Sequence, residues 1–188
     1  MYNLVYYRRG RYLKCFDEYL DELDDAGIEN VTLTKKMGDV DFLDPASVEV
    51  AAAVIASHTV NTPAMHGAFR GIFDLNSTNL TRTLIGHEKL LRHASRLGVK
   101  TYVVHSGSPV AGRDAAEERR CVHEALRGLL PVAEDVGIVI ALENLPPNYV
   151  GHDPHDLVDT VQTINSPYLR LCFDSGHANL CGDAATYL

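Results

Sequence analysis

Four apolar runs in this sequence each end on side chains that can bind a metal ion or transfer a proton. The endings are Met65-His66, Val104-His105, Leu142-Glu143-Asn144 and Phe173-Asp174, the last followed by Ser175-Gly176-His177. A carboxylate that closes an apolar run sits at the edge of a dry core, where it is costly unless it is paired or coordinated. Two such carboxylates with nearby imidazoles suit a divalent cation. The pattern predicts metal binding by His66, His105, Glu143 and Asp174.

Taken singly, each of these side chains has a simpler explanation. A lone histidine at the end of a strand is more often a hydrogen-bonded structural residue than a ligand. Asp174 stands where an aspartate would cap the following helix. The joint pattern is harder to explain in this way, because four consecutive runs end on a residue of the same chemical kind. We therefore favour a shared site over four independent structural roles.

The apolar runs alternate with helical patterns along the chain. They predict six short strands: Asn3–Tyr7, Asn30–Thr34, Val60–His66, Thr101–His105, Ile138–Glu143 and Leu169–Asp174. Between them, apolar residues recur at helical spacing. Three helices end in the same joint, in Ala26-Gly27-Ile28, Leu97-Gly98-Val99 and Val136-Gly137-Ile138, where glycine supplies a left-handed turn. The spacing of about 30 to 40 residues between strands is that of a repeated βαβ unit.

Repeated βα units form a parallel sheet, which is either a closed barrel or an open doubly wound sheet. The sequence has no glycine-rich phosphate-binding fingerprint after any predicted strand, and this favours the barrel. We expect an α/β fold, an incomplete (β/α) TIM barrel with about six of the eight βα units, in one domain over residues 1–188. All strand carboxyl ends of such a barrel lie at one rim, with neighbouring strands about 4.8 Å apart. The four predicted ligands would then share one mouth.

Composition narrows the classes of partner and location. The formal net charge is −8, and no basic patch beyond Arg8–Arg11 and Arg119–Arg120 is visible, so nucleic acid is an unlikely partner. No apolar stretch approaches the roughly 20 residues of a membrane span, and the charge order of the first residues is wrong for a secretory signal. We expect a cytoplasmic protein that acts on a small molecule. The four cysteines form no Cys-x-x-Cys pair, and Cys172 is expected to be a small buried hydrophobe.

The same segments carry a resemblance to a known family. Met65-His66-Gly67-Ala68-Phe69, Val103-Val104-His105-Ser106-Gly107, Ala141-Leu142-Glu143-Asn144 and Cys172-Phe173-Asp174-Ser175-Gly176-His177 resemble the xylose-isomerase-like barrel superfamily. This group includes sugar phosphate isomerases and epimerases and the endonuclease IV type of abasic-site nuclease. In the epimerase branch the resemblance implies that Glu143 and Asp174 bind a divalent metal, that Glu143 also moves a proton beside a carbonyl, and that His177 and Asn144 contact substrate. In the nuclease branch it implies zinc on His66 and His105 too, with Glu143 bridging metals.

The resemblance runs from about Gly27 to the end of the sequence, and the last two βα units of a typical barrel have no counterpart. Three explanations stay open: a fragment of a longer product, a site completed by a second chain through open barrel edges, or an inactive relative. We expect a metal-dependent isomerase or epimerase, with Mn, Mg, Co or Zn as cofactor and weak catalysis by this chain alone. The alternatives are a zinc-dependent abasic-site endonuclease and a non-catalytic truncated barrel.

Overall fold

The computed structural model describes residues 5–6, 15–182 and 184–187. Within these residues the order of helices and strands is α1 (Phe16–Asp25), β1 (Asn30–Thr34), β2 (Lys36–Met37), β3 (Val40–Asp41), α2 (Pro45–Ala56), β4 (Asn61–His66), η2 (Gly71–Phe73), α3 (Leu80–Arg96), β5 (Thr101–His105), α4 (Ala115–Val136), β6 (Val139–Glu143), α5 (Pro154–Ile164), β7 (Leu169–Cys172), α6 (Ser175–Cys181) and η3 (Ala184–Tyr187). None of these helices is both long enough and apolar enough to cross a membrane.

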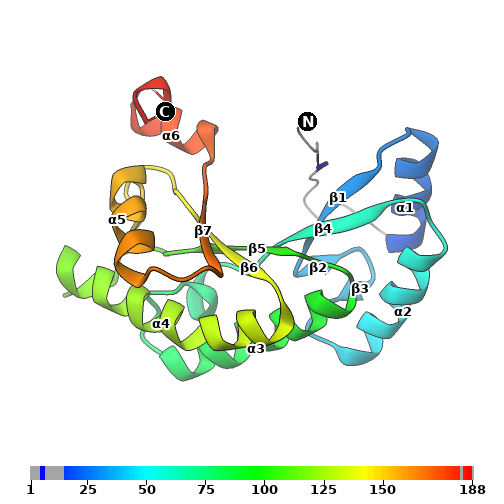
Figure 1. The fold of residues 1–188 in the computed structure, drawn as a ribbon, viewed down its shortest axis with the longest axis horizontal. Helices are drawn as coiled ribbons and strands as arrows, with labels where there is room; N and C mark the ends of the chain where they lie inside the picture. Colours follow the sequence, from blue (N-terminus) through cyan, green and yellow to red (C-terminus); the bar gives the residue numbers. More distant parts are fainter. Residues whose placement is uncertain (1–4, 7–14, 183, 188) are drawn as a thin grey trace.

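Five parallel strands form one sheet in the order β1-β4-β5-β6-β7, and β2 and β3 form a separate antiparallel pair. In Figure 1 the sheet curves, with α2, α3, α4 and α5 along its outer side, as in part of a barrel. The predicted α/β partial barrel is therefore confirmed, and so are five of the six predicted strands. Of the sixth, Asn3–Tyr7, only Val5 and Tyr6 lie within the described residues, and Tyr6 pairs with Val31 as an isolated parallel bridge.

Short-range chemistry explains where the helices start and stop. Asp44, Asn79, Asp114 and Asp153 each accept a backbone hydrogen bond from the first turn of the helix that follows. The three predicted glycine joints have positive φ angles of 68°, 83° and 67° at Gly27, Gly98 and Gly137. A proline inside a helix is expected to kink it or to open its last turns. The turns of α4 after Pro131 stay helical to Val136, and the kink stays a prediction.

The alternation of side chains along each strand separates the core from the site. Tyr102 and Val104 of β5 point into the fully buried layer between sheet and helices, and β6 and the helices add Ile140, Leu142, Leu90, Leu91, Leu126 and Leu129 to that layer. Successive residues of a strand face opposite sides. Val103 and His105 therefore face the concave side, where they line a pocket. Because the apolar side chains of each strand are buried on the side of the sheet that faces the helices, the residues between them must face the pocket.

Candidate metal centre

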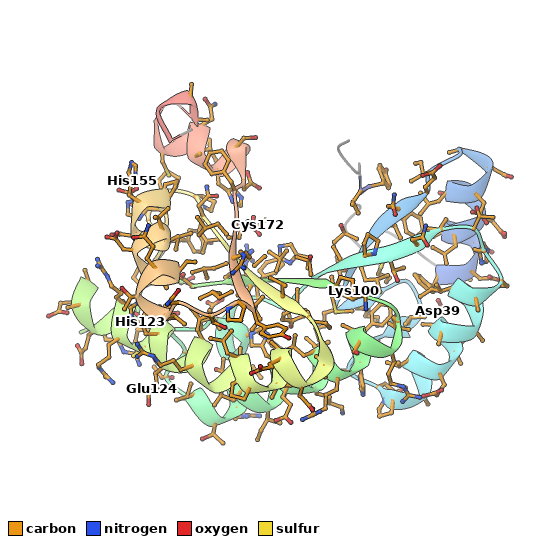
Figure 2. The ribbon with its side chains drawn as sticks, viewed as in Figure 1. Asp39, Lys100, His123, Glu124, His155 and Cys172 are labelled. Carbon is orange, nitrogen blue, oxygen red and sulfur yellow. The ribbon has the colours of Figure 1, made fainter. Side chains whose placement is uncertain are left out.

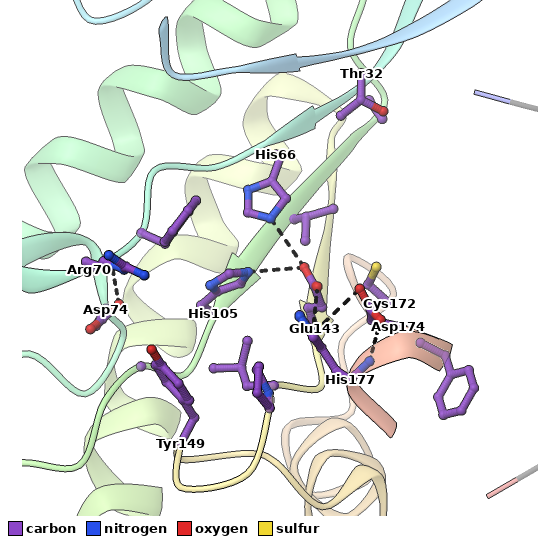
Figure 3. A pocket seen from close by; sticks show the side chains of 17 residues that line it. Thr32, His66, Arg70, Asp74, His105, Glu143, Tyr149, Cys172, Asp174 and His177 are labelled. Carbon is purple, nitrogen blue, oxygen red and sulfur yellow. Dashed lines mark hydrogen bonds and ion pairs between the residues drawn. The ribbon is translucent and has the colours of Figure 1, made fainter. Parts of the chain in front are cut away.

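Three side chains converge where β4, β5 and β6 end. His105 and Glu143 are direct partners in the β5–β6 register, and His66 pairs with Val103 two residues earlier. The Nε2 atoms of His105 and His66 lie 3.1 Å and 3.4 Å from the same oxygen, Oε2 of Glu143 (Figure 3). These residues line a pocket of about 530 Å³ on the concave side of the sheet. Parallel strands in register therefore deliver two imidazoles and a carboxylate to one point.

Hydrogen bonding makes this arrangement unfavourable without a positive charge. The ring of His66 donates from Nδ1 to the Gly67 carbonyl at 2.9 Å, so a neutral ring would aim the Nε2 lone pair at the Glu143 carboxylate. Burial alone would lower the pKa of His66, but its hydrogen bonds with Glu143 and Gly67 outweigh burial and raise it. Burial alone would raise the pKa of Glu143, but hydrogen bonds with His105 and His66 lower it to about 2. The site thus favours a cation between ring and carboxylate, either a proton or a metal ion.

A second pair of potential ligands approaches Glu143 from its other oxygen. The Nδ1 atom of His177 lies 3.4 Å from Glu143 Oε1 and 3.6 Å from Asp174 Oδ2. The same Nδ1 lies 2.9 Å from the Asn144 carbonyl and donates to it, which leaves Nε2 as the ring nitrogen able to bind a ligand. Asp174 caps α6, because its Oδ1 accepts the His177 backbone N–H at 2.7 Å. One carboxylate oxygen of Asp174 is thus used structurally, and Oδ2 faces the site.

The donor set fits a divalent cation. His66, His105 and Glu143 form one group, and Glu143, Asp174 and His177 form another, with ligand atoms inside each group within 4.8 Å of one another. Imidazole nitrogens and carboxylate oxygens are ligands of zinc, manganese, cobalt and iron. The His66 ring is oriented from behind by its bond to a backbone carbonyl, as metal-binding histidines usually are. Glu143 is common to both groups and is the centre of the site.

Comparison with known proteins identifies the family and the fold. The chain matches the xylose isomerase-like TIM barrel family over residues 20–186. It belongs to that family. Among solved structures it is similar to the 3-keto-D-glucoside 4-epimerase YcjR from E. coli, with a TM-score of 0.80, 18% identity and coverage of 95% of this chain and 71% of that one. It is also similar to the IolI protein with a bound zinc atom, with a TM-score of 0.79, 18% identity and coverage of 97% and 66%.

The likeness extends to other proteins with only partial coverage. A D-psicose 3-epimerase structure matches with a TM-score of 0.75 and 17% identity, over 90% of this chain and 61% of that one. An uncharacterized protein of Methanocaldococcus jannaschii, MJ1311, is 41% identical over 66 residues, which are 34% of this chain and 22% of that protein. The chain therefore spans only part of the length of these relatives. At identities below 25% the solved structures establish the shared xylose isomerase-like fold.

One predicted substrate contact does not reach the pocket. Asn144 is 1% exposed, and its side chain bonds the backbone of Asp174 twice, with Oδ1 accepting at 2.7 Å and Nδ2 donating at 2.9 Å. These two hydrogen bonds join the end of β6 to the end of β7 and hold Asp174 beside Glu143. Asn144 thus joins the ends of β6 and β7, and its contact with substrate stays a prediction. The other predicted site residues, His66, His105, Glu143, Asp174 and His177, all line the pocket.

Several pocket residues were not found from the sequence. Phe69, Arg70 and Asp74 come from the loop after β4, and Tyr149 comes from the loop after β6 (Figure 3). Their one sequence signal is position, because loops that follow barrel strands surround the rim. Cys172 was expected to be a buried structural residue, but it is half-buried and lines the pocket. Burial, with Glu143 and Asp174 nearby, raises the pKa of its thiol to about 11, so it is protonated at neutral pH.

Two histidines of the outer helices have contacts outside the group formed by His66, His105 and Glu143. His123 lies on the outer helix α4, and in Figure 2 it is separated from Cys172 on the inner strand β7. His87 of α3 is fully buried, with Nδ1 2.8 Å from the Tyr102 hydroxyl and Nε2 2.8 Å from the Phe73 carbonyl. The contact with Phe73 holds the loop after β4, which carries Phe69 and Arg70, and the contact with Tyr102 joins α3 to β5. His87 is therefore a structural residue of the loop that borders the site.

Proposed function

We propose that this protein is a metal-dependent isomerase or epimerase that acts on a sugar or another small hydroxy-carbonyl compound. The observation that carries the proposal is that the Nε2 atoms of His66 and His105 both face the same oxygen of Glu143. A buried carboxylate approached in this way is a site for a cation. The similar structures of a 3-keto-D-glucoside 4-epimerase and a D-psicose 3-epimerase support sugar chemistry, and the zinc atom bound to IolI supports a metal.

The proposed roles follow from the atoms that face the pocket. Glu143 and Asp174, with His66 and His105, would hold the metal, which when bound polarises carbonyl and hydroxyl oxygens. Glu143 would take the proton from the carbon beside the carbonyl and return it, as a positioned general base. Its low pKa, about 2, keeps it ionised over the whole neutral range, as a metal ligand must be. The Nε2 atom of His177 would contact a substrate oxygen, since Nδ1 is held by the Asn144 carbonyl.

The ligand types narrow the choice of metal within the expected Mn, Mg, Co and Zn. Magnesium prefers oxygen ligands and keeps several waters, whereas imidazole suits zinc and other transition metals. If His66 and His105 contribute nitrogen ligands, zinc, cobalt and manganese fit better than magnesium. Cytoplasmic location and association of copies through open sheet edges remain predictions.

A second candidate function is a zinc phosphodiesterase of the abasic-site nuclease type. The two histidines on Oε2 favour it, because they form a complete nitrogen-rich group beside the Glu143, Asp174 and His177 group. The net charge of −8 opposes it, since a phosphate backbone needs local positive charge. The metal content distinguishes the two: one ion per chain is expected for the isomerase, and two or three zinc ions for the nuclease.

The test is a metal titration with a matched carboxylate control. The purified chain is titrated with Zn²⁺ and Mn²⁺ by calorimetry, beside Glu143→Gln and Glu124→Gln. Glu124 is an exposed carboxylate on the outer helix α4 (Figure 2), so its substitution makes the same chemical change outside the pocket. We expect Glu143→Gln to lose at least the 10- to 100-fold in affinity that even outer-shell substitutions cost, and Glu124→Gln to bind normally. Equal affinity in all three proteins would remove the proposed centre.

The reaction itself is tested by deuterium exchange. The metal-loaded chain is incubated with a ketohexose such as D-fructose in D₂O, and exchange at the carbon beside the carbonyl is followed by NMR. Proton transfer by Glu143 predicts exchange that Glu143→Gln abolishes and Glu124→Gln retains. Metal binding with no exchange from any of a panel of hydroxy-carbonyl compounds would argue against isomerase chemistry.

A further inference from the structure

Arg70 has a backbone conformation that an arginine rarely adopts. Its φ and ψ angles are 73° and 143°, close to a region populated almost only by glycine. The next residue is Gly71, with φ 64°. Non-glycine residues in such conformations are strained, and they cluster at functional sites. The surrounding structure holds Arg70 in place through Asp74, whose Oδ1 accepts the Arg70 backbone N–H at 2.7 Å.

The strained residue is not explained by a structural ion pair. Both oxygens of the buried Asp74 carboxylate are occupied by backbone N–H groups, Oδ1 by Arg70 and Oδ2 by Ser108 at 3.3 Å. Within the described part of the chain, no ion pair of 4.0 Å or less joins the guanidinium to a carboxylate. The guanidinium instead lies over the exposed ring of Phe69, with its carbon 5.9 Å from the ring centre. Its hydrogen-bond donors are therefore available to a ligand.

The guanidinium lies in the same pocket as the metal centre and at its other end. The Phe69 ring, which lies under the guanidinium, has its centre 5.0 Å from the centre of the His105 ring, and His105 contacts Glu143. Figure 3 places Arg70, with Asp74 and Tyr149, on one side of Glu143, and Asp174 and His177 on the other. Tyr149 reaches this side from a turn in which its N–H bonds the Pro146 carbonyl at 3.3 Å and Asn148 has φ 72°. Both ends line the same pocket of about 530 Å³.

We propose that Arg70 binds an oxyanion group of the substrate, so that the substrate is a hydroxy-carbonyl compound bearing a carboxylate or a phosphate. The proposal rests on the proposed isomerase function and specifies that the substrate of that function is negatively charged. Among the described residues that line this pocket, Arg70 is the only lysine or arginine. Its planar fork of donors matches carboxylate and phosphate oxygens in a bidentate manner. The Arg70 side chain therefore determines specificity at the end of the pocket remote from the metal.

The proposal is tested with three six-carbon ketoses that differ in charge. The metal-loaded chain is titrated with D-fructose, D-fructose 6-phosphate and 5-keto-D-gluconate, and the two anionic arms separate phosphate from carboxylate. We expect at least one anion to bind about 10- to 100-fold more tightly than D-fructose, the range of a charge-assisted hydrogen bond. Arg70→Gly should remove this preference, so that the variant binds neutral and anionic ketoses with similar affinity, and Arg70→Lys should keep only part of it. Equal binding of neutral and anionic ketoses, or a preference that survives Arg70→Gly, would overturn the proposal.

The same variants separate ligand binding from folding. Because glycine accepts the Arg70 backbone angles, Arg70→Gly should keep or raise the melting temperature. Asn165→Gly is the matched control, since Asn165 also has a positive φ, 49°, but lies at the end of α5 outside the pocket. A lower melting temperature for Arg70→Gly alone would assign Arg70 a packing role and refute the proposal.

Failure of the metal centre can be told apart from failure of this inference. If the chain binds no metal, inorganic phosphate is added to the metal-free protein and the Arg70 side-chain N–H signal is followed by NMR. A phosphate-dependent shift that is absent in Arg70→Gly supports oxyanion binding even though the isomerase proposal has failed. No shift of the Arg70 signal at millimolar phosphate would overturn the role of Arg70.

Discussion

Protonation of one buried histidine is expected to weaken the fold in acid. His87 is fully buried, and the Phe73 carbonyl can only accept, so Nε2 carries the ring proton and Nδ1 accepts from the Tyr102 hydroxyl. Burial lowers the pKa of His87 to about 4, from 6.5 in the unfolded chain. The unfolded chain therefore binds a proton at His87 at a higher pH than the folded protein does. The stability that neutral His87 contributes is complete above pH 6.5 and is lost as the pH falls through 4.

The size of this effect follows from the two pKa values. One pKa unit corresponds to about 1.4 kcal/mol, so the difference between 6.5 and about 4 makes His87 cost about 2 kcal/mol of unfolding free energy at pH 5 and about 3 kcal/mol at pH 4. Other groups also titrate in this range. His66 contributes with the opposite sign, because its folded-state pKa is raised and its stabilisation is lost as the pH rises. The His87 contribution must therefore be measured as a difference between two proteins.

The assay is urea unfolding of the metal-free chain and of His87→Gln at pH 7.5 and pH 5. The variant is less stable at pH 7.5, because it loses ring packing and one of the hydrogen bonds. We expect the stability gap between the two proteins to shrink by about 2 kcal/mol at pH 5, since only the wild type carries the penalty. A gap that is the same at both pH values would refute the assignment of a low His87 pKa. NMR of the ring nitrogens supplies a direct check, with Nε2–H expected down to about pH 5.

Two further predictions concern the rim and the metal centre. Gly107 has φ 116°, and a Cβ there would collide with Asn76 Oδ1 and the Asp74 side chain, so Gly107→Ala should lower the unfolding free energy by about 1–3 kcal/mol in urea unfolding. Gly112→Ala, at φ 87° with no atom within 4 Å of the added Cβ, should cost less, and equal losses would contradict the contact. Metal affinity should fall about tenfold for each pH unit below the raised pKa of His66, because metal must displace its proton. Calorimetric affinities that match at pH 5.5 and pH 7.5 would exclude His66 as a ligand.

The sequence alone predicted the strands and the convergence of the site for a physical reason. A buried parallel strand must be apolar over its length, and its rim end can be polar, so both signals lie within a few adjacent residues. The parallel register then brings His105 opposite Glu143 without further information. The short pair β2 and β3 was missed, because two residues per strand carry no periodic signal.

Other features depend on contacts between distant segments and were misplaced or missed. Asn144 follows Glu143 directly and looked like a substrate contact, but its amide is taken by the backbone of Asp174, 30 residues later. Cys172 lies on the face of β7 that points to the pocket, as the alternation of side chains along a strand requires. Its apolar neighbours in the sequence had indicated a buried position instead. The conformation of Arg70 leaves no mark in the sequence beyond the glycine that follows it. Long-range hydrogen bonds and backbone angles were therefore the information that only the structure supplied.

The two oxygens of Glu143 relate the number of bound metal ions to the reaction. Oε2 faces His66 and His105, and Oε1 faces His177. If one ion engages Oε2, Oε1 remains free to exchange a proton with substrate, which is what an isomerase requires. If both groups of ligands held metal ions, Glu143 would be a ligand in each and could not also act as the base, and metal-assisted hydrolysis of a phosphate ester would be favoured instead. Loss of proton exchange on addition of a second equivalent of zinc would therefore indicate that Glu143 can serve as the base or as a second metal ligand, but not as both at once. Proton exchange that persists would indicate that the base is a residue other than the metal ligand Glu143.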